Sequence, residues 1–176
     1  MPSVVEIRRL EPADAEAFQA LRLVALRDCP AAFSASLEEE AELPLEVVAA
    51  RMRPGSGRYL FGAFADGTLV GCVGVGREAA RKLAHKAFVR GIYVAQAARG
   101  RGVGRQLMHE ALAFAATLAG VRQVSLVATA NNTGAIALYE SLGFAIWGRE
   151  PDALHADGRF HDDVHMLCAL PVHPTG

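Results

Sequence analysis

The 176-residue chain has the composition of a folded globular domain. Hydrophobic residues make up 52% and charged residues 21%, a balance that excludes an intrinsically disordered chain. The formal net charge is only −1, so no overall positive field favours nucleic acid or an anionic membrane surface. Basic charge is instead concentrated locally, around residues 99–105, which suits a small phosphorylated ligand better than a polymer. We therefore expect a single domain over residues 1–176 that binds neither nucleic acid nor a membrane.

Targeting signals and metal-ligand patterns are both weak in this sequence. Residues 1–10 mix charged with apolar residues, and no run approaches the roughly 18 apolar residues expected of a membrane span. The three cysteines, Cys29, Cys72 and Cys168, cannot all pair and have no metal-ligand spacing. We expect a cytoplasmic protein without a metal.

Hydrophobic periodicity predicts the elements of the first half of the chain. A dipeptide typical of tight hairpin turns, Asp66-Gly67, separates two apolar runs. Residues 31–43 show no regular pattern. The elements expected here are a strand over 4–10, a helix over 14–29, a helix over 44–52, and hairpin strands over 59–64 and 69–75.

The second half alternates between strand and helix patterns. The elements expected are a strand over 87–94, a helix over 101–118, a strand over 124–128, a helix over 132–142, and strands over 144–148 and 160–170. The strand–helix–strand unit over 87–128 predicts a right-handed crossover between parallel strands. The remaining hairpins predict an α/β fold with a mixed, mostly antiparallel sheet of about seven strands and about four helices.

A turn rich in glycine and arginine lies between the predicted strand 87–94 and the helix that follows it. Its seven residues include Arg99, Gly100, Arg101, Gly102, Gly104 and Arg105. Glycines allow close approach of the backbone to a ligand, and a helix N-terminus offers unpaired N–H groups to an anion. Arginine matches the geometry of phosphate oxygens. The turn therefore predicts a site for pyrophosphate.

Two common phosphate-binding loops do not fit this turn. The chain has no Gly-Lys-Ser/Thr tripeptide, which a Walker A loop requires. A G-x-G-x-x-G dinucleotide motif fails because its last position falls on Arg105 or Leu107, depending on the glycine that starts it.

Two motifs in the chain resemble those of the GNAT family of N-acetyltransferases. Arg99-x-x-Gly102-x-Gly104 resembles the family's acetyl-CoA signature. About thirty residues later, Asn132-x-x-Ala135-x-x-x-Tyr139-x-x-x-Gly143-Phe144 resembles its second cofactor motif. The resemblance extends over roughly residues 4–170. It implies a GNAT-like single domain that transfers an acetyl group from acetyl-CoA directly to a primary amine, a small molecule rather than a protein.

The resemblance also implies where acetyl-CoA binds. Its pantetheine arm lies between the parallel strands 87–94 and 124–128, with a strand N–H near Ile92 as oxyanion donor. Tyr139 is expected to be the general acid, because a phenol holds its proton at a pH where a thiol leaves as thiolate. The residues expected to bind the cofactor are Ile92, Tyr93, Val94, Arg99, Gly100, Arg101, Gly102, Val103, Gly104, Arg105, Asn132, Ala135 and Tyr139.

The sequence leaves the general base and the acceptor open. Many relatives carry a glutamate on the strand before the glycine turn, where this chain has Arg90. The alternative to an enzyme is an acyl-CoA-binding regulatory domain without turnover. Also open are a homodimer and a preference for longer acyl groups. The candidate bases are Glu38, Glu39, Glu40, His85, His161, Asp162, Asp163 and His165.

Overall fold

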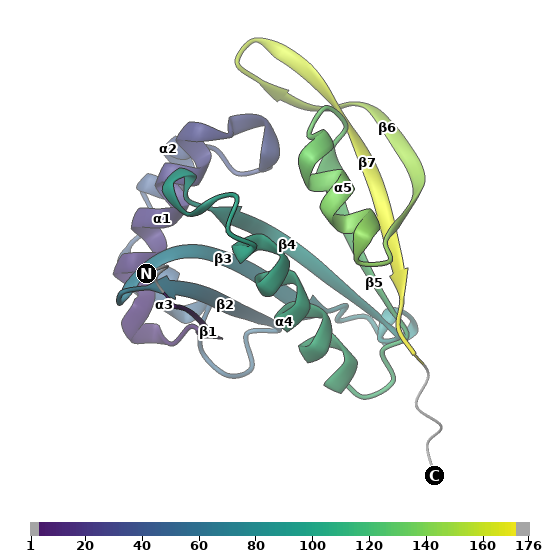
Figure 1. Ribbon diagram of the computed structural model, residues 1–176, viewed down its shortest axis with the longest axis horizontal. Coiled ribbons are helices and arrows are strands. Elements are labelled where there is room, and N and C mark those ends of the chain that lie inside the picture. Colours follow the sequence, from purple (N-terminus) through teal and green to yellow (C-terminus); the bar gives the residue numbers. More distant parts are fainter. Residues whose placement is uncertain (1–3, 172–176) are drawn as a thin grey trace.

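Side chains of the central strands alternate between the two faces of one sheet. The computed structural model describes residues 4–171 (Figure 1). On β3 (Thr68–Arg77), Val73 and Val75 belong to one core cluster, whereas Cys72 belongs to a second cluster on the opposite face. Such a strand is apolar on both faces because both are covered.

Seven strands form the sheet in the spatial order β1-β2-β3-β4-β5-β7-β6. Of the six neighbouring pairs in this described sheet, only β4 and β5 run parallel, as the crossover predicted. The other strands are β1 (Val5–Arg9), β2 (Arg58–Ala65), β4 (Lys86–Val94), β5 (Gln123–Thr129), β6 (Ala145–Ala156) and β7 (Arg159–Ala169).

Helices cover both faces of the sheet. The crossover helix α4 (Val103–Thr117) buries Leu107, Met108 and Ala111 in the first cluster, and α1 (Ala15–Asp28) packs on the other face with Phe18 and Leu21 in the second. None of the described helices is long and apolar enough to cross a membrane. The remaining helices are α2 (Leu37–Ala41), α3 (Leu45–Ala50) and α5 (Thr133–Ser141).

The parallel strands β4 and β5 separate along their length. They pair over three residues only, from Lys86–Gln123 to Phe88–Ser125, and Figure 1 shows them diverging beyond this point. On its other edge, which faces β3, β4 has a bulge. Two residues of β4 stand there opposite Val73 of β3, and one of them, Gly91, adopts a φ of +64°. A bulge bends a strand, so it contributes to the divergence. The fold thus leaves an unpaired strand edge in the middle of the sheet.

The far end of β5 is tied to the first half of the chain. The buried Thr129 donates a hydrogen bond from Oγ1 to the carbonyl oxygen of Ala31 at 2.6 Å. Ala31 lies in a short 3₁₀ turn, Pro30–Ala32, directly after α1. This segment therefore packs against β5 at the open end of the gap.

The predicted α/β fold with its seven-stranded mixed sheet is confirmed, with two local differences. Residues 37–41 form the fifth helix, α2, in a segment predicted to be irregular. Its capping box uses the Ser36 hydroxyl and the Glu39 carboxylate. Strand β6 was predicted to end at Gly148 but continues to Ala156, paired with β7 through register irregularities on both sides of Glu150.

Candidate active site

The glycine turn places three backbone N–H groups at the start of α4. Gly100 and Gly102 have φ values of +72° and +76°, a left-handed conformation that side chains other than glycine's rarely adopt. Gly102 is the N-cap of α4, and no side chain caps this end. Because a helix cannot pair its first N–H groups internally, those of Val103, Gly104 and Arg105 are available to an anion.

Gly104 is a glycine that the fold itself does not require. Its φ is not positive, and an added Cβ would lie 3.5 Å from Leu138 Cδ2 and 3.7 Å from Val94 Cγ2, which are ordinary contacts. Glycine inside a helix also costs about 0.5–1 kcal/mol relative to alanine. A ligand that lies against this backbone explains the glycine better than packing does, so the turn fits a pyrophosphate group.

The arginines of the turn are exposed at its surface. Arg99 donates from Nε to the carbonyl oxygen of Val94 at 2.9 Å, and Arg105 donates from Nη2 to Ser141 Oγ at 3.0 Å. Arg101 is also exposed. These contacts hold Arg99 against the end of β4 and Arg105 against α5, so both charges border the turn.

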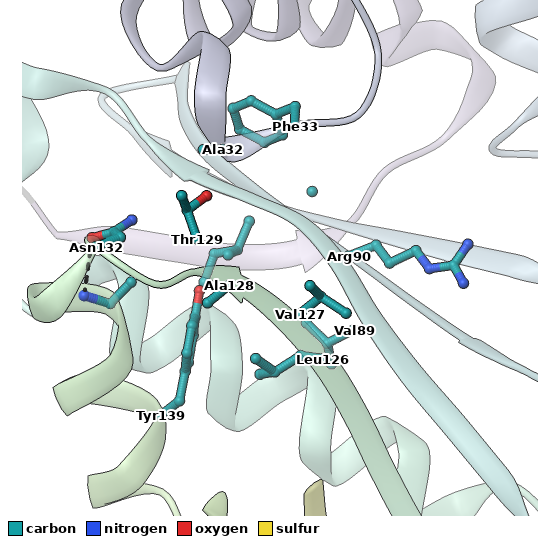
Figure 2. A pocket seen from close by; sticks show the side chains of 13 residues that line it. Ala32, Phe33, Val89, Arg90, Leu126, Val127, Ala128, Thr129, Asn132 and Tyr139 are labelled. Carbon is teal, nitrogen blue, oxygen red and sulfur yellow. Dashed lines mark hydrogen bonds between the residues drawn. The ribbon is translucent and has the colours of Figure 1, made fainter. Parts of the chain in front are cut away.

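A small pocket of about 60 Å³ lies where β4 and β5 diverge (Figure 2). Of the predicted cofactor residues, those that line it are Ile92, Asn132, Ala135 and Tyr139. Figure 2 shows Tyr139 reaching from α5 toward the strands, with its hydroxyl at the end nearest to them. Within residues 4–171 this hydroxyl has no hydrogen-bond partner, although it is not sealed in the interior.

Burial raises the pKa of Tyr139 to about 12. Only 5% of the residue is exposed, so a phenolate there would lose most of its hydration. The side chain therefore holds its proton at any pH at which an enzyme works. Its free hydroxyl is able to donate a hydrogen bond into the gap.

The open edge of β4 supplies backbone donors beside this hydroxyl. Ala95 donates its N–H to Val70 on the β3 side, and hydrogen bonds to one neighbour recur at every second residue. The N–H of Val94 therefore points to the β5 side, where β4 has no partner strand. Ile92 is one of the two bulge residues, and it lines the pocket in the gap.

Two predicted cofactor residues have structural bonds as well. The Tyr93 side chain lies on the α1 face and its hydroxyl donates to Asp28 Oδ2 at 3.0 Å, and by the same alternation its N–H faces β3. Asn132 caps α5, because its Oδ1 accepts the N–H of Ala135 at 3.3 Å, the dashed line in Figure 2.

A larger cavity of about 600 Å³ adjoins the small pocket on the α1 face of the sheet. The two meet in the gap between β4 and β5, because eight residues line both of them: Ala32, Phe33, Val89, Arg90, Gly91, Leu126, Val127 and Thr129. The charged residues that line the larger cavity are Arg22, Glu40, Arg51, Arg58, Arg90, Glu150, Asp163 and His165.

Comparison with known proteins identifies this arrangement. The model of the Acetyltransferase (GNAT) family matches residues 18–144, which is most of the chain. The chain belongs to the GNAT acetyltransferase family. No curated protein matches it by sequence.

Solved structures of GNAT proteins share the whole fold. An acetyltransferase of the GNAT family from Streptococcus pneumoniae has 23% identity and a TM-score of 0.85, over 96% of this chain and 100% of that one. A putative acetyltransferase from Salmonella typhimurium, solved with its cofactor acetyl-CoA, has 22% identity and a TM-score of 0.80, over 99% and 98%. Ribosomal-protein-alanine N-acetyltransferase from Brucella melitensis has 27% identity and a TM-score of 0.77, over 94% and 99%.

The GNAT fold brings only some of the candidate bases to the cavity. Glu40, Asp163 and His165 line it, but Glu40 is buried in an ion pair with Arg51. Glu38 and His85 are exposed elsewhere, Glu39 caps α2, and Asp162 pairs with Arg149 at 2.7 Å. His161 is also absent from the cavity wall among the described residues.

Sequence reasoning missed one acidic residue of the cavity. Glu150 lies on the continuation of β6 that was not predicted, opposite Asp163 on β7, and its Oε2 is 2.9 Å from His165 Nε2. Burial, and then the charge of Glu150, raise the pKa of Asp163. Glu150, Asp163 and His165 form what we call the acidic wall. Within residues 4–171, no group of three His, Cys, Asp or Glu side chains has a geometry suited to a metal ion.

Proposed function

We propose that this GNAT protein catalyses direct transfer of an acetyl group from acetyl-CoA to the primary amine of a small molecule. The observation that carries the proposal is the meeting of two cavities in the strand gap. Tyr139 and the open edge of β4 lie on one side, and the charged cavity lies on the other. A cavity of about 600 Å³ is within the range of small-molecule sites.

The residues around the gap suit the charges that develop during acyl transfer. As the amine nitrogen bonds to the acetyl carbon, negative charge grows on the carbonyl oxygen, and the N–H groups of Val94 and Ile92 are placed to stabilise it. When the C–S bond breaks, Tyr139 is placed to donate its proton to the thiolate sulfur. Tyr139 then recovers a proton from solvent.

The amine must also lose a proton, and the acidic wall is the group of residues best placed to accept it. An imidazole whose Nε2–H is held by a carboxylate keeps Nδ1 free as a proton acceptor, and Glu150 holds His165 Nε2 in this way. Asp163 is adjacent on the same strand, and its raised pKa makes it a better base than an ordinary surface carboxylate. These residues take the place of the strand glutamate found in many relatives.

The positions of the cysteines support direct transfer. Within the described residues, neither cavity is lined by a cysteine. Burial raises the pKa of Cys72 to about 12 and also raises that of Cys168, so neither forms a thiolate nucleophile at neutral pH. An acetyl-cysteine intermediate therefore has no support in this arrangement.

The alternative of a regulatory acyl-CoA-binding domain has one point in its favour, which is Arg90 at the position of the missing glutamate. The acidic wall weakens it, because a sensor does not need proton acceptors on the far side of the gap. Release of free thiol from acetyl-CoA in the presence of an amine panel separates the two functions.

Replacement of Tyr139 by Phe tests the proposed chemistry. We expect kcat to fall by up to about 10²–10⁴-fold, because the proton donor is lost while the ring stays packed against Phe144. The affinity for acetyl-CoA, measured by calorimetry, should be nearly unchanged. Single-turnover rates equal to those of the wild type would show that Tyr139 is only a core residue.

A further inference from the structure

One wall of the larger cavity is strongly cationic. Four arginines from four different elements line it: Arg22 on α1, Arg51 directly after α3, Arg58 at the start of β2, and Arg90 on β4. Arg22 Nη1 would lie 3.5 Å from a Cβ built on Gly91, so this guanidinium lies beside the bulge at the gap. We call these four residues the arginine wall.

The protein neutralises only one charge of the arginine wall. Arg51 donates two hydrogen bonds to the buried Glu40, at 3.0 and 3.1 Å. Arg22 instead lies over the ring of Phe33 at 4.8 Å and Arg90 over that of Phe88 at 4.4 Å. Within residues 4–171, neither of these two nor Arg58 forms an ion pair with a carboxylate. Three positive charges therefore face the cavity without a directly paired carboxylate from residues 4–171, and Glu40 acts on Arg22 and Arg58 only at a longer distance.

These charges are held together at an energetic cost. Burial lowers the pKa of Arg58, and the charges of Arg51, Arg90 and Arg22 lower it further. Burial likewise lowers the pKa of Arg22. Partly buried cations that repel one another are destabilising unless an anion joins them. The planar fork of each guanidinium is suited to bidentate binding of a carboxylate or a phosphate-type group.

The opposite side of the same cavity carries the opposite charge. Glu150 and Asp163 line it from β6 and β7, across β5 from the strands that carry Arg58 and Arg90. A ligand that fills the cavity thus meets positive charge at one end and negative charge at the other. An amine with no second charge would use only the acidic wall.

We propose that the acceptor is a small zwitterionic amine, whose anionic group binds the arginine wall while its amino group faces the acidic wall. This inference rests on the proposed function for the position of the amine, but the anion site stands independently of turnover. The anionic group is a carboxylate, as in an amino acid, or a phosphonate-type group of similar charge. The arginine wall would then select the acceptor, and Tyr139 would act on whichever amine is bound.

Matched pairs of acceptors test the selection. The common α-amino acids are compared with their α-carboxamides, and aminoalkylphosphonates with the corresponding uncharged amino alcohols, by thiol release from acetyl-CoA. We expect kcat/KM to be at least about 10-fold higher for the anionic member of the preferred pair, an effect of the size expected for a charge-assisted bidentate contact. The series of pairs with the larger ratio of kcat/KM, anionic to uncharged, shows whether the arginine wall prefers a carboxylate or a phosphonate. Equal rates within every pair would overturn the proposal.

Variants of the arginine wall locate the effect. Arg58→Gln and Arg90→Gln should raise KM for the anionic acceptor about 10-fold or more and leave kcat/KM for its uncharged partner nearly unchanged. Arg53→Gln is the control, because Arg53 is exposed and does not line the cavity. Thermal unfolding of Arg58→Gln should be unchanged or shifted upward, since repulsion is relieved. An equal loss for charged and uncharged acceptors would instead indicate a structural role.

A binding measurement separates this inference from the proposed function. Calorimetry of the same amine pairs is carried out with CoA present and without turnover. Binding of the anionic member that is lost in Arg58→Gln supports the arginine wall even if no acetyl transfer occurs, in which case only the proposed function fails. If no anionic member of either series binds more tightly than its uncharged partner, the arginine wall does not select the acceptor.

Discussion

The sequence has glycine at different positions of the glycine turn for different physical reasons, and this difference makes the candidate site testable. Gly100 and Gly102 are required by their left-handed backbone, so a side chain there would be strained even though space is open. Gly104 has ordinary helical backbone and room for a methyl group. Only at Gly104 does a substitution separate the needs of the ligand from those of the fold.

Gly104→Ala should therefore weaken CoA binding without loss of stability. The added methyl group covers backbone that pyrophosphate would contact, whereas alanine favours the helix by up to about 0.5–1 kcal/mol. Calorimetry with CoA and urea unfolding measure the two effects. His109→Ala, on the exposed side of α4, is the control for a change in the helix alone. Unchanged CoA affinity in a folded Gly104→Val protein would contradict the assigned turn.

At the scale of elements, the bulge of β4 determines where the sheet opens. Gly91 adopts φ +64° there and lies against Arg22, so Gly91→Ala should destabilise the protein by about 1–2 kcal/mol, the usual cost of a left-handed residue with a side chain. Urea unfolding measures this loss. Gly148→Ala is the matched control, since its backbone is not left-handed and an added Cβ has no neighbour closer than 4.0 Å. Equal stability of the two variants would show that the bulge tolerates a side chain.

The elements also show which parts of the site were accessible from the sequence. The cofactor side is local: a strand, a glycine turn and a helix follow one another over residues 86–117, and Asn132 and Tyr139 share one short helix. Residue types and spacing were enough to predict these elements and the two motifs on them, and the binding of acetyl-CoA to them stays a prediction. The acceptor side depends on residues far apart in the chain, such as Arg22, Arg58 and Glu150, that only the tertiary fold brings together. Gly148 and Pro151 are typical strand breakers. They interrupt the strand pattern, so the part of β6 that carries Glu150 was not predicted.

At the scale of the whole molecule, two buried neutral groups make stability sensitive to high pH. The pKa of Cys72 and that of Tyr139 are each raised to about 12, from ordinary values of 9.0 and 10.0. Above pH 9 the unfolded chain releases these protons, while the folded chain retains them until about pH 12. The stability is thus fully present below pH 9 and is lost as the pH rises through this window, by about 4 kcal/mol for Cys72 and about 3 kcal/mol for Tyr139.

Urea unfolding between pH 8 and pH 11 measures this dependence. The free energy of unfolding should fall with pH in the wild type, and less steeply in Tyr139→Phe and in Cys72→Ala. Comparing slopes rather than absolute stabilities removes the cost of each substitution itself. Wild-type slopes in both variants would assign the alkaline loss to other groups.

The gap between β4 and β5 also connects the two faces of the sheet. Three residue pairs join the strands at one end, and at the other the bond from Thr129 to Ala31 ties β5 to the segment after α1. The gap is therefore a window through the sheet, with Tyr139 on one side and the larger cavity on the other. Two ligands that approach a window from opposite sides do not obstruct each other. The proposed function then allows acetyl-CoA and the amine to bind in either order, and each product to leave by the side from which its parent entered.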